Sequence, residues 1–339
     1  MNKITLKVIA EKLGVSVSTV SRALTGKPGV SKELRDKIIA TAKKLGYYPD
    51  ATATGLRRGK TMTIGVLLPE LSGDFFSQIV TGMEKVLFHL GYRLMLCPTD
   101  DDPEKEAAQI KMLISQKVEG ILSAPADMKA NRSLYSQVIN DMGIPIVFFD
   151  RLVEGVDTDY VLTDNEDGIR QLVDYLMSKG HRRIGMIHPL KGTFTGEARL
   201  RAFLEYKDRI EIKEEWVKDG KSSEVGGYEA FRSLIREKDK PTALIVGNNL
   251  MTLGVLKAAR DLSVKIPDDI SLVSFDDAYW NEIFDPPITC VAQDPHQIGL
   301  ITATILLDKM KNKRERGKRT NVVLKVRFIE RSSVKKVKG

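Results

Sequence analysis

The segment from Thr5 to Gly46 constrains the fold most, because it repeats one short pattern three times. Each repeat starts after a serine or threonine, which caps helix N-termini well, and continues with apolar residues at helical spacing. Gly14 ends the first run, Leu6–Leu13, and a glycine there readily adopts the left-handed conformation that stops a helix. Ser16 and Ser31 precede the other two runs. The pattern predicts three short helices, of which the first two form a helix-turn-helix.

The second of these predicted helices carries side chains suited to reading DNA. In a helix-turn-helix, the second helix enters the major groove with its N-terminal residues against the base edges. Arg22 can bond guanine in bidentate fashion, and Val17 can contact a thymine methyl group. A three-helix packing domain with a solvated polar face is the alternative interpretation. The residues expected to contact DNA here are Thr5, Ser16, Val17, Ser18, Thr19, Ser21 and Arg22.

Beyond this general pattern, the run from Gly14 to Leu24 resembles the LacI family of bacterial transcription regulators. The resemblance continues in Val30-Ser31 and in Leu45-Gly46-Tyr47-Tyr48-Pro49. It implies that residues 1–49 form an all-α DNA-binding domain. In such a regulator, two copies of this domain would bind a pseudo-palindromic operator, because a symmetric site mirrors a twofold protein.

Residues 50–60 match the hinge helix of that family, which folds when two copies meet on operator DNA. Leu56 matches the leucine that wedges into the minor groove, where such a wedge unstacks a base step and kinks the duplex. Ala53 and Arg57 complete the expected DNA contacts. Two positions depart from the family pattern: Thr54 stands where an arginine is common, and Val8 where an aspartate is common.

From Thr61 onward, short apolar runs alternate with amphipathic helical segments, and after a link at Val156–Tyr160 the cycle restarts. This alternation predicts parallel sheets covered by helices on both faces, and its repetition predicts two similar subdomains. Strands are expected at Ile64–Leu68, Arg93–Cys97, Gly120–Ser123, Ile146–Phe149, Ile184–His188, Ala243–Val246, Ser271–Phe275 and Val322–Arg327.

Sequence motifs of several enzyme classes are missing from the chain. There is no glycine-rich dinucleotide or Walker loop and no G-x-S-x-G elbow, and the four histidines lack metal-like spacing. We therefore expect no catalytic activity, no metal and no cofactor. Cys97 and Cys290 lie in apolar runs and are expected to be reduced core residues. The chain has no apolar run of membrane-spanning length and no signal pattern, which predicts a cytoplasmic protein.

The positive charge of the chain is concentrated at its two ends. Residues 1–60 hold thirteen Lys and Arg against four Asp and Glu, and residues 309–339 hold thirteen against two, so the middle is acidic. A basic head on an acidic body fits a phosphate-seeking module joined to a body that does not itself bind DNA. The basic tail is interpreted as a solvated helix end and terminus, with a second DNA contact as the alternative.

The body resembles LacI-family regulatory domains in six segments: Asp74–Phe76, Phe149–Arg151, Thr163–Asn165, Gly180–Ile184, Pro267–Ser271 and Phe275–Asp277. The resemblance implies the periplasmic-binding-protein fold, in which three crossovers join two doubly wound parallel-sheet lobes. Residues 61–339 would then bind an effector and dimerise. One lobe would comprise about 61–161 plus 292–322, and the other about 162–291 plus 323–339.

That fold places its ligand between the lobes at the carboxyl ends of the strands. Carboxylates, amides and arginines suit the vicinal hydroxyls of a polyol, and Phe76 or Trp280 offers a flat face to a sugar ring. One position departs from the family: Asn249 stands where an aspartate is usual. The resemblance implies an effector site formed by Asp74, Phe76, Arg151, Arg199, Asn248, Asp276, Trp280 and Gln293.

Together these features predict a homodimeric repressor whose affinity for double-stranded operator DNA is controlled by a small ligand, with a sugar as the expected effector. Three alternatives remain. The same regulator could respond to a purine or to a phosphoprotein corepressor, or the body could be a two-domain α/β enzyme. A periplasmic transport protein shares the body fold, but the basic head and the missing signal sequence argue against it.

Overall fold

The computed structural model describes residues 4–47, 61–311 and 319–337. Contacts between residues divide the chain into two compact units, residues 1–61 and residues 62–339, which we call the head and the body. Each unit has buried apolar residues that pack together within that unit. The predicted hinge helix at residues 50–60 lies outside the described residues.

Residues 4–47 of the head form three helices: α1 (Leu6–Leu13), α2 (Val17–Leu24) and α3 (Lys32–Lys44). The Ser16 hydroxyl accepts a hydrogen bond from the Thr19 amide at 3.1 Å, and Ser31 caps α3 in the same way through Leu34. Gly14 adopts the left-handed conformation, with φ 64°, and ends α1. The apolar faces of the three helices meet in one small core that includes Ile9, Ala10, Val20, Ala23, Ile38 and Ala42.

Thr5 occupies the N-cap position of α1, as predicted, but its side chain makes no capping hydrogen bond. The two serine caps therefore hold α2 and α3 more firmly at their N-termini than Thr5 holds α1. The expectation that Thr5 caps α1 is wrong for the side chain.

The described part of the body forms two six-stranded sheets, in the orders β11-β5-β4-β3-β1-β2 and β12-β10-β9-β8-β6-β7. All pairs in both sheets are parallel except the edge pair of β10 with β12, which is antiparallel. The strands are β1 (Thr63–Leu68), β2 (Arg93–Pro98), β3 (Gly120–Ser123), β4 (Ile146–Phe149), β5 (Asp159–Thr163), β6 (Ile184–His188), β7 (Val217–Asp219), β8 (Ala243–Val246), β9 (Ser271–Phe275), β10 (Thr289–Ala292), β11 (Asn321–Leu324) and β12 (Arg327–Ile329).

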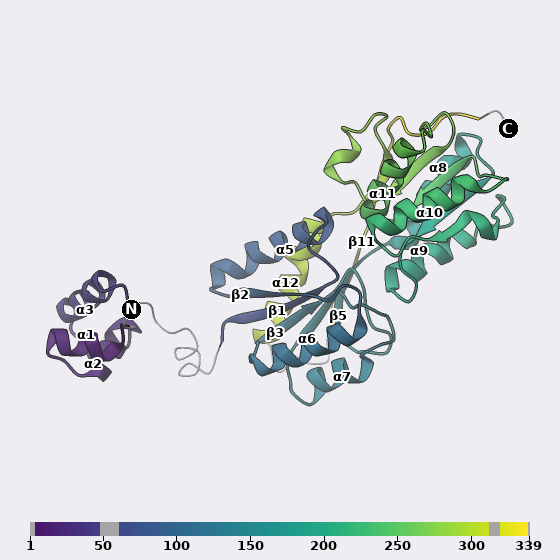
Figure 1. Ribbon diagram of the computed structural model, residues 1–339. Helices are drawn as coiled ribbons and strands as arrows, with labels where there is room; N and C mark the ends of the chain where they lie inside the picture. The colour runs from purple at the N-terminus through teal and green to yellow at the C-terminus, as the bar shows by residue number, and fades with distance from the viewer. Residues whose placement is uncertain (1–3, 48–60, 312–318, 338–339) are drawn as a thin grey trace. The chain divides into compact units, whose positions relative to one another are not determined.

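Helices cover both faces of each sheet (Figure 1). In the first lobe, Ile64, Val66 and Leu68 of β1 pack toward α5 and α12, whereas Leu67 packs on the opposite face toward α6 and α7. This alternation follows from the two-residue period of a strand. The α-helices of the body are α5 (Asp74–Leu87), α6 (Pro103–Ser115), α7 (Arg132–Asn140), α8 (Asn165–Ser178), α9 (Phe194–Leu204), α10 (Glu224–Arg236), α11 (Asn249–Asp261) and α12 (Pro295–Lys311).

Short 3-10 helices interrupt the loops of the body at three places within residues 61–311 and 319–337. They are η1 (Phe88–Leu90), η2 (Glu214–Trp216) and η3 (Tyr279–Asn281). The second lobe has its two helical layers in α8 with α9 and in α10 with α11, and each layer packs on one face of the second sheet.

Several segments differ from the sequence prediction, which expects no strand at β7 or at β10. The segment predicted as a link at Val156–Tyr160 leads directly into β5, which pairs between β4 and β11 near the edge of the first sheet. The single strand predicted at Val322–Arg327 is two strands in different sheets, β11 and β12, separated by Lys325 and Val326. A strand-like run of residues does not show where the chain leaves one sheet for the other, because each half of the run can pair with a neighbouring strand of either sheet.

The chain therefore passes between the two sheets three times. It leaves the first sheet after Thr163, returns to the first lobe between Ala292 and Pro295, and leaves again after Leu324. Each passage connects directly to the carboxyl end of a strand or to the start of a helix. The strand ends of both lobes consequently face one another, as this fold requires of a site between its lobes.

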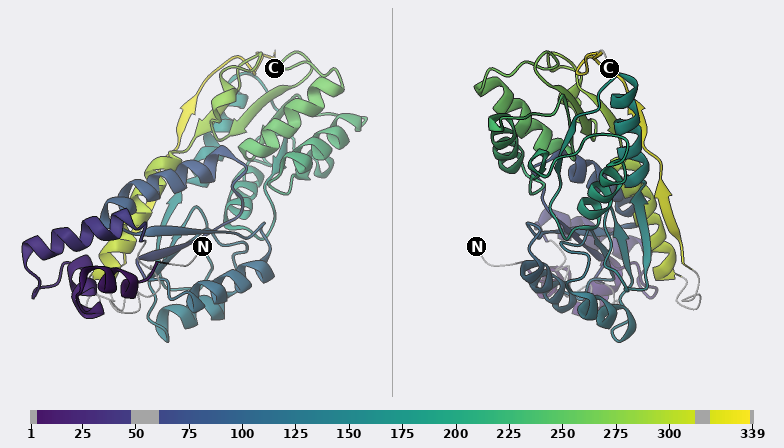
Figure 2. Two further views of the ribbon diagram at one scale, coloured as in Figure 1. Left: turned by 60° about the vertical axis from the view of Figure 1, so that its left-hand side comes forward. Right: turned by 90° about the vertical axis from the view of Figure 1, so that its right-hand side faces the viewer.

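Helices α5 and α12 lie side by side and approach each other closely through two glycines (Figure 2). A Cβ atom on Gly82 would lie 2.3 Å from the His296 carbonyl oxygen, and one on Gly299 would lie 2.0 Å from the carbonyl oxygen of Ile79. Because backbone atoms cannot move aside as a side chain can, both positions require glycine. In the described part of the chain, no helix combines the length and apolarity needed to cross a membrane.

We expect Gly299→Ala to lower the free energy of unfolding of the body by about 2 kcal/mol, because the added methyl group forces α5 and α12 apart. Chemical denaturation followed by circular dichroism measures this loss. Thr304→Ala, on the exposed side of α12, is the matched control and should leave the midpoint nearly unchanged. An unaltered midpoint for Gly299→Ala would show that the two helices do not depend on this close approach.

Candidate ligand-binding site

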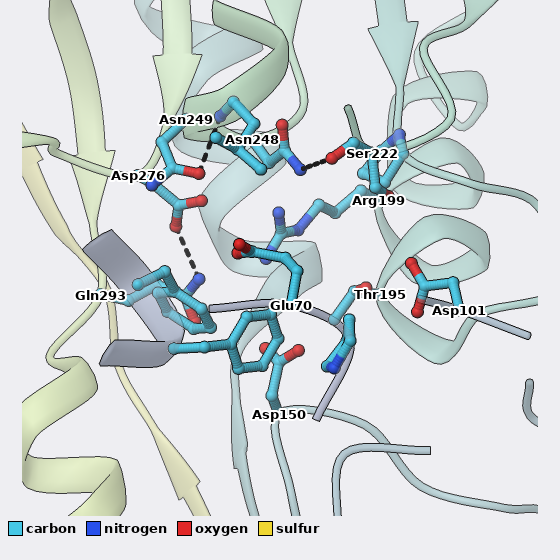
Figure 3. A pocket seen from close by; sticks show the side chains of 15 residues that line it. Glu70, Asp101, Asp150, Thr195, Arg199, Ser222, Asn248, Asn249, Asp276 and Gln293 are labelled. Atoms are coloured by element: carbon cyan, nitrogen blue, oxygen red, sulfur yellow. Dashed lines mark hydrogen bonds between the residues drawn. The ribbon is translucent and has the colours of Figure 1, made fainter. Parts of the chain in front are cut away.

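A cavity lies in the body where the strand ends of the two lobes meet (Figure 3). Its lining comes from both lobes and from the passage between them. The lining residues are Pro69, Glu70, Phe75, Phe76, Asp101, Asp150, Pro189, Thr195, Arg199, Ser222, Asn248, Asn249, Leu250, Asp276 and Gln293.

Arg199 on α9 reaches the cavity from the second lobe and is only 3% exposed. Its Nε donates to Asn165 Oδ1 at 2.7 Å, and its Nη1 donates to the carbonyl oxygen of Gly247 at 2.5 Å. The guanidinium carbon also stacks 3.6 Å from the centroid of the Phe275 ring, a favourable cation–π geometry. Burial lowers the pKa of Arg199, but an arginine stays charged in a protein. The site therefore holds one firmly fixed cation.

Asp276 follows β9 in a left-handed conformation, with φ 79°, which directs its carboxylate toward the cavity. The carboxylate accepts a hydrogen bond from Gln293 Nε2 at 2.7 Å (Figure 3). Gln293 follows β10 at the second passage between the lobes, and its own Oε1 is buried without a hydrogen-bond partner. Burial raises the pKa of Asp276. A ligand donor can satisfy the open oxygen of Gln293.

Asp150 follows β4 in the first lobe, also in a left-handed conformation, with φ 60°. It is 4% exposed, and burial raises the pKa of its carboxyl group to about 6, with Arg151 and Arg199 acting in the opposite direction. Its nearest cationic atom is Arg151 Nε at 3.5 Å. A buried carboxylate whose pKa is raised in this way is typical of a functional site.

Arg151 is directed away from the cavity lining and into an ion pair with Asp101, which itself lines the cavity. Asp100 and Asp101 both have positive φ values, 56° and 55°. Residues other than glycine rarely adopt this conformation, so the backbone of the turn that carries Asp101 is strained. The pKa of Arg151 is raised by Asp101 and Asp150 against its burial. Arg151 was predicted to contact the ligand. In the structure it does not line the cavity, and it pairs instead with Asp101, which does.

The remaining predicted effector residues divide into two groups. Phe76 lines the cavity, and Asn248 both caps α11 through the Met251 amide at 2.8 Å and donates to the Ser222 carbonyl oxygen at 3.2 Å. The structure places Asp74 and Trp280 outside the cavity lining. Asp74 accepts a hydrogen bond from Gln78, one turn along α5, and Trp280 packs against the apolar core of the second lobe.

Sequence reasoning missed several residues that line the cavity. Glu70, Asp101, Asp150 and Ser222 each follow a strand by a few residues, which is the signal that could have identified them. Thr195 lies one turn before Arg199 on α9 and therefore shares its face of the helix. In the part of the chain that the structure describes, no group of three or more histidine, cysteine, aspartate or glutamate side chains could hold a metal ion.

The predicted DNA-reading residues of the head lie together on α2 and its cap. Val17 is 43% exposed although it is apolar, and Ser18 and Arg22 are exposed on the same helix. The Ser16 hydroxyl lies 2.7 Å from that of Ser18 and 2.8 Å from that of Thr19, so three hydroxyl groups gather at the N-terminus of α2. The polar face of α2 is thus free of the head's core. Ala53, Leu56 and Arg57 lie outside the described residues.

Comparison with known proteins gives matches over both units. The family model described as "Bacterial regulatory proteins, lacI family" matches residues 5–50, and the model "Periplasmic binding protein-like domain" matches residues 173–334. The HTH-type transcriptional repressor PurR of Proteus mirabilis is 32% identical over 333 residues, which cover 97% of this chain and 96% of that protein. PurR of Klebsiella pneumoniae is 31% identical with the same coverage.

Solved structures resemble the whole chain as well. The lac repressor dimer bound to operator and the anti-inducer ONPF has a TM-score of 0.84 and 25% identity, over 98% of this chain and 100% of that one. The complex of the transcriptional regulator CelR with cellobiose has a TM-score of 0.71 and 27% identity, over 97% of this chain and 99% of that one.

The raised pKa of Asp150 predicts how stability depends on pH. Between the ordinary value of 3.8 and about 6, the folded protein binds more protons at this site than the unfolded chain does. The contribution of Asp150 to the free energy of unfolding is therefore highest at low pH and is lost as the pH rises through about 6. The full effect corresponds to at most about 3 kcal/mol.

We expect Asp150→Asn, which mimics the protonated carboxyl group, to raise the free energy of unfolding at pH 7.5 by about 1 to 3 kcal/mol. The gain should shrink at pH 4.5, where the folded wild-type protein already carries the proton. Urea denaturation at the two pH values measures both. Asp174→Asn, a surface carboxylate paired with Arg209 at 3.7 Å, is the control. A destabilised Asp150→Asn at pH 7.5 would contradict the prediction.

Proposed function

We propose, from the premise that this chain belongs to the LacI family of bacterial regulatory proteins, that a small polyhydroxylated ligand in its cavity controls its binding to operator DNA. The chain is a DNA-binding transcriptional regulator and not an enzyme, since its relatives over nearly the whole length are transcriptional repressors. A helix-turn-helix head on a two-lobed body supports repression controlled by a ligand.

The observation that carries this proposal is the origin of the cavity lining. Glu70, Phe76 and Asp150 come from the first lobe, whereas Arg199, Asn248 and Asp276 come from the second. A ligand that contacts both sets favours one arrangement of the lobes over others. If operator DNA also binds one arrangement of the lobes more tightly than another, then ligand binding and DNA binding affect each other. This coupling is reciprocal.

Each part of the chain has its own task in this proposal. Residues 1–49 bind one operator half-site, residues 50–60 form the hinge helix on DNA, and residues 61–339 bind the effector and dimerise. Within the body, one lobe comprises about 61–161 plus 292–322 and the other about 162–291 plus 323–339. The exposed side chains of Phe88, Leu90 and Leu96, at the end of α5 and on the edge strand β2, support an apolar contact between two copies.

The lining supports a sugar as the ligand. Buried carboxylates and a fixed guanidinium can bond vicinal hydroxyl groups, and Phe75 and Phe76 contribute aromatic rings from the first lobe only. The structural relative CelR was solved with cellobiose, and a regulator from Enterococcus faecium, 25% identical with a TM-score of 0.71 over 81% of this chain and 100% of that one, was solved with ribose.

A purine is the second candidate ligand, favoured by the sequence similarity to repressors named PurR. A purine ring is flat on both faces and gains most when aromatic groups cover both. No aromatic residue of the second lobe lines the cavity in the described part of the chain, because Pro189, Ser222 and Leu250 occupy that side. This difference makes the sugar the better match.

The DNA-binding half of the proposal is tested with an operator selected from genomic fragments by the full-length protein. Arg22→Ala should weaken binding by about tenfold or more, because a bidentate guanine contact is lost. Leu56→Ala should lose most of its affinity while the protein stays folded. Fluorescence anisotropy measures affinity and also stoichiometry, which should be two chains per operator.

Lys37→Ala, an exposed position on α3, is the matched control and should change affinity only slightly. Wild-type affinity for Leu56→Ala would refute the hinge role, and one chain per operator would refute the dimer.

The ligand-binding half is tested by thermal shift of the full-length protein against monosaccharides, disaccharides, sugar acids and nucleobases. A ligand at a hundred times its Kd should stabilise the folded state by about 2.7 kcal/mol, so the melting temperature should rise by a few degrees. Asp276→Ala should abolish the rise, whereas Asp174→Ala should retain it. The circular dichroism spectrum and the cooperative melting transition without ligand show whether Asp276→Ala is folded. Stabilisation by purines alone would contradict the sugar proposal.

A further inference from the structure

The cavity contains more negative charge than its arginines can balance. Glu70, Asp101, Asp150 and Asp276 line it, and only one cationic side chain, Arg199, lines it with them among the described residues. Arg151 pairs with Asp101 but does not itself line the cavity. Four carboxylates with two guanidinium groups leave an excess of negative charge.

Arg151 is already committed to other carboxylates. It forms an ion pair with Asp101, it lies 3.5 Å from Asp150, and the buried carboxylate of Glu106 also acts on it. Glu106 is completely buried and accepts hydrogen bonds from the Tyr135 hydroxyl at 2.8 Å and from the Ala126 amide at 3.0 Å. The charge of Arg151 is thus shared among three acidic groups and leaves little for the cavity.

Arg199 is fixed by the neutral groups Asn165 and Gly247 and by the Phe275 ring. No ion pair joins it to Glu70, Asp150 or Asp276 in the described ranges of the body. One guanidinium at this position can offset part of the field of these three carboxylates but not all of it.

Glu70 places its carboxylate in the cavity (Figure 3). Its Oε2 atom accepts hydrogen bonds from the Ser72 hydroxyl and from the Gly73 amide, both at 2.6 Å. These two bonds fix the carboxylate at the start of α5. Neither of these two partners is a cation, so neither offsets the charge of a carboxylate in the site.

Two further hydrogen-bond acceptors of the site lack a donor, and a ligand can supply one. The carboxylate of Asp150, 4% exposed, accepts no side-chain or backbone hydrogen bond within the described residues and has only the 3.5 Å contact with Arg151. The Oε1 atom of Gln293 is buried without a donor. Both are acceptors, so the ligand that satisfies them must be rich in hydrogen-bond donors.

We propose that the effector is an amino sugar bound in its ammonium form, with the positive charge among the cavity carboxylates. This inference rests on the proposed function and names the ligand class of the same site. An ammonium group has three donors and one positive charge, so it meets both the excess of carboxylates and the open acceptors. The ring hydroxyls then bond Arg199, Asn248 and Gln293, and the apolar ring face lies on Phe75 and Phe76.

The same field disfavours acidic ligands. A sugar phosphate or sugar acid would bring negative charge next to Glu70, Asp150 and Asp276, with only Arg199 in the lining to receive it. A neutral sugar can make the hydroxyl contacts but leaves the charge excess uncompensated. The order of affinity should therefore be amino sugar, then neutral sugar, then acidic sugar.

The test is calorimetric titration of the full-length protein at pH 7.0 with three matched pairs: glucosamine and glucose, galactosamine and galactose, mannosamine and mannose. One amino sugar should bind about tenfold or more tightly than its neutral parent, since an opposite charge at close range in a partly buried site is worth at least that factor. Glucose 6-phosphate and glucuronic acid should bind most weakly.

Two further measurements isolate the charge. At about pH 9.5 the amine is mostly neutral, because amines beside electron-withdrawing groups titrate near 8, and the preference should disappear. Glu70→Gln should reduce the preference about tenfold, whereas Asp174→Asn, which removes one surface charge, should not change it. Putrescine, which carries charge without hydroxyl groups, should bind more weakly than the amino sugar.

Each other outcome overturns the inference. Neutral parents that bind as tightly as the amino sugars, tighter binding of an acidic sugar, or a preference that survives at pH 9.5 would refute the ammonium and leave a sugar-controlled regulator standing. Equal binding of putrescine would refute the sugar. Binding of nucleobases alone, or of none of these compounds, would refute the amino sugar, and in the first case the sugar proposal as well.

Discussion

The buried guanidinium of Arg199 is the interaction on which the second lobe and the ligand site both depend. A charge removed from water must find hydrogen bonds and a polarisable neighbour, and Arg199 finds them in Asn165, Gly247 and the Phe275 ring. These three residues lie at the start of α8, after β8 and at the end of β9. One side chain thereby ties three strand-end segments together. Loss of Arg199 would release the segments that shape one wall of the cavity as well as the charge inside it.

The sequence allowed the general form of this site to be predicted, but not its exact members. Capping serines such as Ser16 were found because they depend on local chain chemistry, whereas Asp276 was found through the resemblance to a known family. Asp150 was missed in favour of its neighbour Arg151, since the left-handed backbone at Asp150 decides which of the two side chains reaches the cavity. That conformation is set by strand pairing and burial, which no local pattern reveals.

Short edge strands, and the places where the chain changes sheets, were equally hard to predict. β7 and β12 are only three residues long and contain charged residues, so neither shows an apolar run. β11 and β12 look like one strand until the pairing partners are known. In contrast, the alternation of strands with amphipathic helices was sufficient to predict two similar subdomains, each with a parallel sheet covered by helices on both faces. Long periodic segments are determined by burial of one face, whereas short edge segments are determined by what lies beside them.

The close contact of α5 with α12 has a mechanical consequence. α5 begins beside the cavity, where it carries Phe75 and Phe76, and it runs for fourteen residues to the exposed apolar side chain of Phe88. At 1.5 Å per residue this rod is about 21 Å long. Gly82 and Gly299 bring backbone against backbone near its middle, so few side-chain atoms separate α5 from α12 there. Side chains can change rotamer when a helix moves but backbone atoms cannot, so a displacement at the cavity end of α5 should move its far end and α12 together.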